Sequence, residues 1–260
     1  MNKALLCVSF GTSVPQARRS IEAVEEALGS AAADRQLCRA FTSTIIRRIL
    51  AGRGEEIPGV TEALEALAAR GVTDVLVQPT HILPGNEYDK IRREMAPFQG
   101  RFSALTMGAP LLGDTDDLRA LAAVLSEAYP PQAEEPLVLF GHGTDHLTNV
   151  MYPALQTVFR LMGRDDVLVG TVEGWPAYED VAAQMERGGW RRARLVPLML
   201  VAGDHAMNDM AGPTDSWRTR LEAAGYAVRW DIRGLGELAG IRALYCRHLA
   251  RTLEEMGHGL

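Results

Sequence analysis

Short apolar runs alternate with longer stretches of helical period along almost the whole chain. The apolar runs have the length and composition of buried strands. They cover Ala4–Ser9, Leu37–Thr42, Asp74–Pro79, Phe102–Met107, Leu137–Phe140, Val167–Val172, Ala193–Leu198 and Tyr226–Asp231. The stretches between them predict helices over Pro15–Leu28, Val60–Arg70, Glu87–Ala96, Asp116–Glu127, Thr148–Met162, Ala177–Arg187 and Thr214–Ala224. Alternation of this kind is typical of α/β proteins whose parallel sheets are covered by helices.

The strands fall into two groups of four, separated by a proline-rich polar segment. This segment, residues 129–136, cannot continue the preceding helix and predicts a linker. We therefore expect an N-terminal α/β half over residues 1–128 and a C-terminal α/β half over residues 137–236. The remaining residues, 237–260, are expected to form a last helix that packs back across the molecule.

The two halves repeat one another locally. Pro79 and Pro197, like Gly85 and Gly203, lie 118 positions apart, and in the same frame Glu87 corresponds to His205. A second repeat aligns Phe10-Gly11-Thr12 with His142-Gly143-Thr144, each directly after an apolar run. Ligands of open parallel sheets bind beyond the carboxyl ends of the strands, where these residues lie. We expect His142, His205 and Glu87 to converge on one cleft between the halves.

Composition and charge exclude several classes of protein. The net charge of −6 and the lack of a long Lys/Arg run argue against a nucleic-acid binder. The apolar runs are too short for a membrane span, and the start of the chain lacks a signal-peptide cleavage pattern. Three widely spaced cysteines fit a reducing compartment. We expect a soluble cytoplasmic protein that binds neither nucleic acid nor membrane, and homo-oligomer formation stays open.

Two imidazoles and a carboxylate are suitable ligands for cobalt, nickel, iron or zinc, with positions left for water or substrate. Each residue also has an ordinary interpretation. A histidine in a glycine turn, such as His142, is as often a hydrogen-bonding turn residue as a catalytic one. Its counterpart Phe10, however, indicates that the fold does not require imidazole at this place. His205 could be a solvent-exposed loop residue. Acidic residues such as Glu87 favour the first turn of any helix, and only its alignment with His205 singles it out.

The other histidines have weaker claims to a function. His81 is interpreted as a cleft-lining residue or as a satisfied core histidine. His146, four residues after His142, has the spacing of a helical metal pair, but no HExxH-type glutamate lies between them. His248 and His258 are expected on the surface.

Glycine-containing turns offer backbone N–H groups and hydroxyls at helix starts, which favour anionic oxygens such as carboxylates. Substrate-binding residues are therefore predicted at Phe10, Gly11, Thr12, Ser13, His81 and Thr144. The chain has neither a GxGxxG nor a GxxxxGK[ST] motif, so no nucleotide cofactor is expected.

Four motifs together resemble the anaerobic sirohydrochlorin cobalt chelatases, which are ATP-independent class II chelatases related in fold to the ferrochelatases. The motifs are Val8-Ser9-Phe10-Gly11-Thr12-Ser13, His81-Ile82-Leu83-Pro84-Gly85-Asn86-Glu87-Tyr88, Gly141-His142-Gly143-Thr144 and Gly203-Asp204-His205-Ala206. The resemblance covers essentially the whole length. It implies two similar Rossmann-like or flavodoxin-like halves with four-stranded parallel sheets, related by a pseudo-twofold axis.

The resemblance also implies an activity and roles for residues. The reaction is insertion of cobalt(II), as substrate metal, into sirohydrochlorin during anaerobic cobalamin biosynthesis. By this resemblance His142, His205 and Glu87 hold the metal, His142 and Glu87 are catalytic, and His142 accepts protons. The same ligand set would suit a chelatase for nickel or iron. A metal-dependent hydrolase or oxygenase would use the same types of ligand, and a non-catalytic tetrapyrrole or metal carrier is also compatible with the sequence.

Overall fold

The computed structural model describes residues 2–258, with side chains described as far as Met256. The chain divides into two compact units. Unit 1 comprises residues up to Gly113 together with those from Ala239 onward, and unit 2 comprises Asp114–Leu238. Among the described residues, no helix combines the length and the apolar character needed to cross a membrane.

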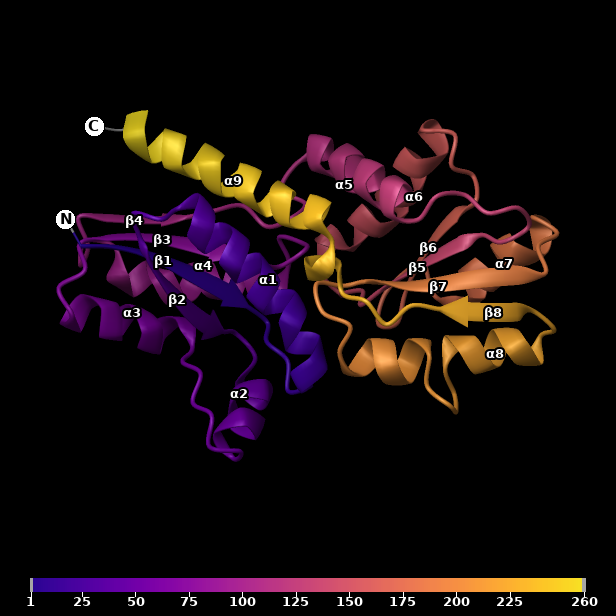
Figure 1. Cartoon of the computed structure of the whole chain (residues 1–260), viewed down its shortest axis with the longest axis horizontal. Helices are drawn as coiled ribbons and strands as arrows, with labels where there is room; N and C mark the ends of the chain where they lie inside the picture. Colours follow the sequence, from indigo (N-terminus) through magenta and orange to yellow (C-terminus); the bar gives the residue numbers. More distant parts are fainter. Residues whose placement is uncertain (1, 259–260) are drawn as a thin grey trace. The chain divides into compact units, whose positions relative to one another are not determined.

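Unit 1 is a four-stranded parallel sheet covered by helices (Figure 1). The strands run in the order β2-β1-β3-β4. In chain order the elements are β1 (Lys3–Ser9), α1 (Pro15–Ala31), β2 (Gln36–Phe41), α2 (Thr44–Ala51), α3 (Val60–Ala69), β3 (Asp74–Pro79), α4 (Asn86–Met95), the short η1 (Ala96–Phe98), β4 (Ala104–Met107) and α9 (Ala239–His258).

Unit 2 repeats this architecture with the order β6-β5-β7-β8. Its elements are α5 (Thr115–Ala128), β5 (Leu137–Gly141), the short η2 (Leu147–Val150), α6 (Met151–Leu161), β6 (Val167–Thr171), α7 (Tyr178–Arg187), β7 (Arg192–Leu198), η3 (Ala206–Met210), α8 (Trp217–Ala223), β8 (Ala227–Trp230) and η4 (Leu235–Glu237). Both orders correspond to the first four strands of flavodoxin-like sheets. The predicted α/β class, with a four-stranded parallel sheet in each half, is confirmed.

The internal repeat is also present in the strand register. Val8 of β1 pairs with Pro79 of β3, and Phe140 of β5 pairs with Pro197 of β7. The two prolines that align in the sequence therefore occupy the same place in the two sheets. The glycines that follow the first strand of each sheet agree as well, since Gly11 has φ +98° and Gly143 has φ +85°.

The division between the units lies earlier than the predicted linker at residues 129–136. Helix α5 begins after Asp114, whose side chain accepts a hydrogen bond from the Asp117 N–H, and it packs against α6. A helix that the sequence assigned to the first half therefore belongs to unit 2. The linker residues connect two elements of that same unit.

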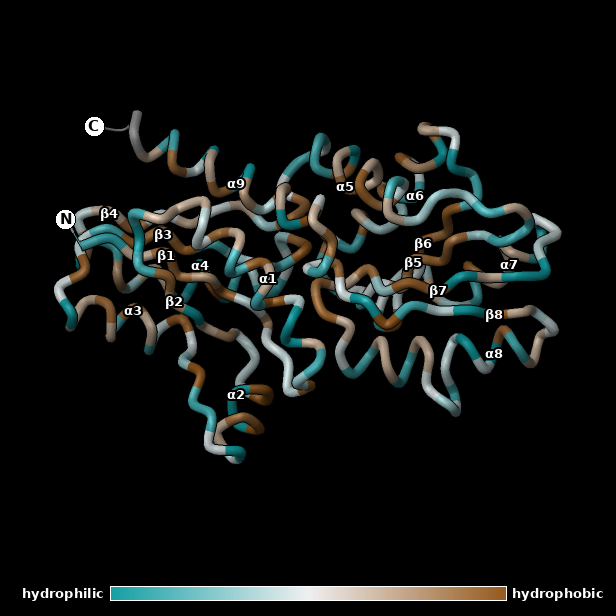
Figure 2. Tube along the Cα trace, viewed as in Figure 1, coloured by the Kyte–Doolittle hydropathy of each residue, from teal (hydrophilic) through white to brown (hydrophobic). Residues whose placement is uncertain are grey.

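Helix α9 follows unit 2 in the chain but belongs to unit 1, where it packs against α1 and β4 (Figure 1). Turns of hydrophobic and hydrophilic colour alternate along it, as in an amphipathic helix (Figure 2). Its buried stripe includes Ile241, Tyr245, His248 and Thr252. The expectation that His248 is a surface residue was therefore wrong, because the residue is only 1% exposed. The His258 side chain lies outside the described residues.

The sequence pattern missed helix α2. This helix has a capped start, where the Ser43 side chain accepts a hydrogen bond from the Ile46 N–H. It has only eight residues, so its apolar positions recur only once. Ile45 and Ile49, four residues apart, are exposed on one side of the helix instead of being buried in the core.

Candidate metal centre

The carboxyl ends of three neighbouring strands lie level in unit 2. In the parallel register, Gly141 of β5 pairs with Thr171 of β6 on one side and with Leu198 of β7 on the other. His142 follows β5 directly, and Glu173 comes two residues after β6. The ladder continues beyond the strand ends, because the Glu173 N–H donates to the His142 carbonyl over 2.7 Å. The backbone therefore holds these two residues side by side.

Two glycines allow the chain to turn closely around His142. A Cβ at Gly141 would collide with the ring of Tyr152, and a Cβ at Gly143 would lie 2.5 Å from the backbone nitrogen of Gly174. Gly143 also has a positive φ of 85°, which other residues rarely adopt. The Gly143 N–H donates to the buried Tyr152 hydroxyl over 3.2 Å. Because these two positions lack a side chain, the loop that carries His142 can lie directly against Tyr152 and Gly174.

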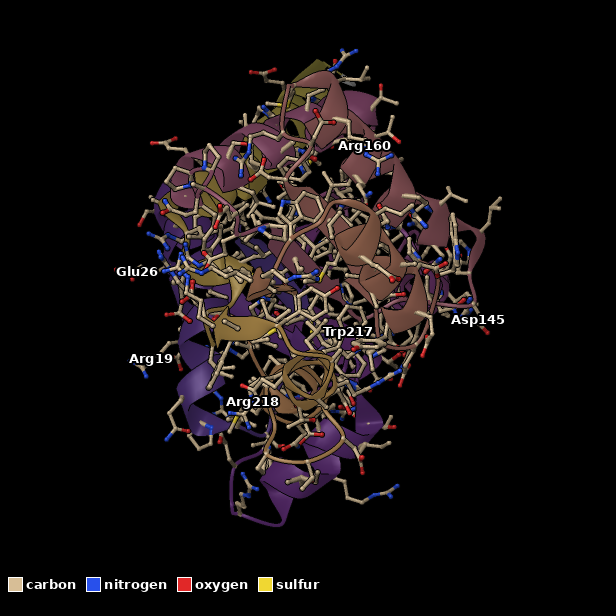
Figure 3. All side chains as sticks on the ribbon, turned by 90° about the vertical axis from the view of Figure 1, so that its right-hand side faces the viewer. Arg19, Glu26, Asp145, Arg160, Trp217 and Arg218 are labelled. Carbon is tan, nitrogen blue, oxygen red and sulfur yellow. The ribbon has the colours of Figure 1, made fainter. Side chains whose placement is uncertain are left out.

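An aromatic side chain packs against the two strands that lead to His142 and Glu173. Trp217 is 5% exposed and contacts Phe140 edge to face, with ring centroids 5.0 Å apart. Its ring also fills the space above Gly170 of β6, where a Cβ would lie 2.6 Å away. Figure 3 shows Trp217 among the interior side chains, whereas Asp145 lies at the periphery. This packing holds the ends of β5 and β6 in place.

His142 and His205 meet in unit 2. Their ring centroids lie 4.6 Å apart with an interplanar angle of 89°. Glu173 completes a group in which each residue offers one ligand atom and all these atoms lie within 4.8 Å of one another. The side chains of His142, Glu173 and His205 are 44%, 57% and 35% exposed, so an ion can reach them from solvent.

The hydrogen bonds around His142 define which ring nitrogen is free. Its Nδ1 lies 3.0 Å from the carbonyl oxygen of Gly143, which can only accept. Nδ1 therefore carries the proton in the neutral ring, and Nε2 keeps the lone pair for a metal or a proton. The Glu173 carboxylate lies 3.6 Å from the same Nδ1.

Glu173 was missed by the sequence reasoning, which assigned the carboxylate ligand to Glu87. A signal existed, because Glu173 follows an apolar strand at the same sheet edge as His142. Its counterpart in unit 1 is Ser43, whose N–H donates to the Phe10 carbonyl as the Glu173 N–H donates to the His142 carbonyl. A serine at this place gave no sign of a metal ligand.

Glu87 lies in unit 1, in the first turn of α4, and its Oε2 is buried without a hydrogen-bond partner among the described residues. The structure therefore brings together two of the three predicted ligands, His142 and His205. The participation of Glu87 stays a prediction.

The predicted substrate loop of unit 1 follows β1. Phe10 is 48% exposed, whereas Thr12 is buried and its hydroxyl accepts a hydrogen bond from the Val14 N–H over 3.2 Å. A Cβ on Gly11 would lie 2.6 Å from the ring of Phe41, so this position is closely packed. The Ser13 carbonyl oxygen accepts a hydrogen bond of 2.6 Å from the side chain of Arg53, in the loop after α2.

His81 is not a satisfied core histidine. Both ring nitrogens are buried without a hydrogen-bond partner among the described residues. Burial lowers the pKa of His81 from 6.5 to about 4, and the positive charge of Lys90 acts in the same direction. The ring is therefore neutral at physiological pH.

Thr144 and His146 are engaged in the local structure of unit 2. The Thr144 N–H donates to Asn149 Oδ1 over 3.1 Å, and its hydroxyl accepts from the His146 N–H. His146 precedes η2, where its Nδ1 accepts from the Thr148 N–H over 3.2 Å. Residues 142–146 are not helical, so the spacing of four does not place His146 beside His142 as in a helical metal pair.

The comparison with protein families identifies the chain. The profile of the family described as "Cobalt chelatase (CbiK)" matches residues 3–254. The chain belongs to this family. Sirohydrochlorin cobaltochelatase of Salmonella typhimurium is 40% identical over 257 residues, which cover 97% of each of the two chains. Sirohydrochlorin cobaltochelatase CbiKC of Nitratidesulfovibrio vulgaris is 32% identical over 259 residues, covering 98% of this chain and 92% of the relative.

Solved structures of chelatases share the fold of this cobalt chelatase family member. SirB from Bacillus subtilis with Fe3+ aligns with a TM-score of 0.66 at 17% identity and covers 100% of this chain and 98% of its own. A structure of the sirohydrochlorin chelatase SirB in complex with cobalt, from Bacillus subtilis subspecies spizizenii, aligns with a TM-score of 0.61 at 17% identity and the same coverage. At this level of identity the likeness establishes the fold alone.

Proposed function

We propose that this chain inserts cobalt(II) into sirohydrochlorin and that His142, Glu173 and His205 hold the incoming ion. Membership of the cobalt chelatase family and two relatives that are sirohydrochlorin cobaltochelatases support the reaction. The convergence of two imidazoles and a carboxylate within 4.8 Å carries the assignment of residues. We place the enzyme in the cytoplasm, which the three free cysteines support.

The ligand geometry suits temporary binding of a divalent ion. Ligand atoms of an ion with bonds of about 2.1 Å lie no more than about 4.2 Å apart, so spacings within 4.8 Å require only small side-chain movements. Three protein ligands leave coordination positions for water and for the tetrapyrrole nitrogens. Structural sites, by contrast, are closed by a fourth protein ligand. A partly exposed, open set of ligands can release its ion to a macrocycle that binds more tightly.

Two protons must leave the pyrrole nitrogens for each cobalt(II) that enters. A neutral imidazole can ligate a divalent ion or accept a proton near neutral pH. His142 has its Nδ1–H directed at the Gly143 carbonyl, so its Nε2 is the atom that would accept. Glu173, 3.6 Å from Nδ1, would stabilise the positive charge that protonation creates on the ring.

The acidic substrate must approach a chain of net charge −6, so local donors are needed. We propose that the loop formed by Phe10, Gly11, Thr12 and Ser13, and the Thr144 hydroxyl, contact the tetrapyrrole. The ring nitrogens of His81 are buried, so a role of His81 in substrate binding stays a prediction. Phe10 offers an exposed ring for stacking on the macrocycle. The Thr144 N–H is already bonded to Asn149 and is not available for a substrate carboxylate.

The proposal is tested by following the absorbance of sirohydrochlorin with cobalt(II) and purified protein, against a protein-free control and without added ATP. We expect acceleration, and we expect cobalt to give a higher initial rate than nickel or iron. A protein that binds sirohydrochlorin without accelerating insertion would be a carrier, and the proposed activity would be wrong.

Variants then test the residues. His142→Ala, His205→Ala and Glu173→Gln are each expected to reduce kcat/KM by at least about tenfold, in the range typical of metal-site ligands and catalytic bases. Glu179→Gln is the matched carboxylate control, because Glu179 is paired with Arg220 on the surface. Glu87→Gln measured beside Glu173→Gln decides which carboxylate holds cobalt. If Glu173→Gln retained full cobalt affinity, the ligand set proposed here would be wrong.

A further inference from the structure

The two imidazoles of the metal centre are supported differently. Behind His142 lies a neutral backbone carbonyl, that of Gly143, at 3.0 Å. Behind His205 lies a carboxylate, since Asp209 Oδ2 is 2.6 Å from His205 Nδ1. We propose that Asp209 is a positioning residue that holds His205 in the tautomer and orientation needed to bind the metal, an inference that rests on the proposed function above.

The chemistry of the pair determines the tautomer. An ionised carboxylate only accepts hydrogen bonds, so His205 Nδ1 must be the donor. The neutral imidazole carries a single N–H, and its Nε2 therefore keeps the lone pair. Nε2 is the nitrogen left to share an ion with His142 and Glu173. Without Asp209 the ring would be free to rotate and to place its proton on Nε2, where it would block the metal.

The local backbone is built to hold this pair. His205 and Asp209 are four residues apart at the start of η3, a single wide turn of the π type. Turns of this type are frequent at functional sites. Ala206 and Met210 of the same turn are fully buried in the core of unit 2 and anchor it. His205 and Asp209 keep side-chain exposures of 35% and 43%, so the turn presents them outward together.

The different hydrogen-bond partners of the two imidazoles give the two histidines different roles. A carboxylate behind a ligating imidazole raises its basicity as a ligand and fixes the ring. His205 is thus the firmer metal ligand. His142 donates to a neutral carbonyl and therefore binds the ion more weakly. It is the better placed of the two histidines to release the metal and to take up a pyrrole proton.

The same turn supplies a matched control. Asp204 accepts a hydrogen bond from Asn208 Nδ2 over 2.8 Å, an i, i+4 pair one residue displaced from the pair of His205 and Asp209. Asp204→Asn and Asp209→Asn remove the same charge from the same turn. Only the second changes the partner of His205 Nδ1: the amide of asparagine can turn its NH2 group towards Nδ1 and so favour the Nε2–H form, which an ionised carboxylate cannot do. A general electrostatic effect on cobalt binding would appear in both variants, whereas a positioning effect appears in one.

The first experiment titrates full-length protein with cobalt(II) in the absence of tetrapyrrole and follows the visible absorption of the bound ion. We expect Asp209→Asn to weaken cobalt binding by about 10- to 100-fold. Asp204→Asn is expected to change it by less than about threefold, and Asp209→Glu to recover most of the affinity. Equal effects of Asp204→Asn and Asp209→Asn, or wild-type affinity in Asp209→Asn, would overturn the proposal.

The second experiment reads the tautomer directly in the metal-free protein. Nitrogen chemical shifts from proton–nitrogen correlation spectra distinguish an Nδ1–H from an Nε2–H imidazole. We expect His205 to be the Nδ1–H form in the wild type and to lose this preference in Asp209→Ala. An Nε2–H form in the wild type would contradict the positioning role, whether or not the protein binds cobalt. A wild type that binds no cobalt, yet shows the Nδ1–H form, would instead contradict the proposed function.

Discussion

The buried imidazole of His81 makes the stability of this protein depend on pH in a way that one substitution removes. In the native state burial lowers the pKa of His81 to about 4, whereas the ordinary value for an exposed histidine is 6.5. Between these values the unfolded state binds a proton that the native state does not. Stability from this residue is therefore fully present above the unfolded pKa and is lost as the pH falls from 6.5 towards 4.

The expected size of the effect follows from the two pKa values. Lowering the pH from about 7.5 to about 5 should cost the wild type about 2 kcal/mol through His81, since one pKa unit corresponds to about 1.4 kcal/mol. His81→Met is the appropriate perturbation, because Met199 holds the corresponding place in the second copy of the repeat. Methionine does not titrate and leaves no ring nitrogens buried without partners.

The assay is urea unfolding at the two pH values, followed by fluorescence and circular dichroism to check that the transitions coincide. The difference between wild type and His81→Met isolates the titration of His81, because the other groups are common to both. Lys90→Gln should retain most of the effect, since burial is the larger cause and the charge of Lys90 the smaller one. Equal loss of stability in wild type and His81→Met would refute the reasoning.

Three further predictions concern packing around the sites. Gly143→Ala is expected to weaken cobalt binding at least about tenfold, because its Cβ would lie 2.5 Å from a backbone nitrogen; Gly163→Ala, which shares the positive φ but has no atom within 4 Å, should leave cobalt binding unchanged. Tyr152→Phe removes the acceptor of a buried N–H and should lower the free energy of unfolding by about 1–3 kcal/mol, and a loss below about 0.5 kcal/mol in urea would contradict this. Burial raises the pKa of the Cys7 thiol, so a thiol reagent followed by peptide mapping should label Cys7 after the other cysteines, and early labelling of Cys7 in folded protein would disprove it.

Much of the architecture could be predicted from the sequence because local patterns determine it. Buried parallel strands require apolar runs, and each of the eight expected runs coincides with a strand to within two residues at either end. The repeat of Pro79 and Pro197 predicted equivalent sheet positions, which the registers of β3 and β7 confirm. Helix α2 was missed because it has only eight residues, so its apolar positions recur only once, and because part of its apolar face is exposed.

Other features depend on contacts between distant parts of the chain. The place of α5 in unit 2 follows from its packing against α6, and no local pattern encodes this. The burial of His248 does not belong to this group: the local pattern was enough to predict it, since the residue lies on the same helical stripe as Ile241 and Tyr245. Comparing only the two stretches where the sequence repeat is visible led to Glu87 and away from Glu173, whose counterpart in unit 1 is Ser43.

The sequence by itself determined the order of the strands along the chain, the duplicated sheet and a histidine in the loop after each of two strands, because these depend on periodicity and on residues at fixed spacing. Only the tertiary structure decided which side chains meet. Glu173 joins His142 and His205 because parallel pairing brings the ends of β5, β6 and β7 to one edge. Asp209 supports His205 because a wide turn anchored in the core aims both side chains outward. Strand register and core packing are set by interactions across the whole unit, and they decide distances of a few ångströms on which metal chemistry depends.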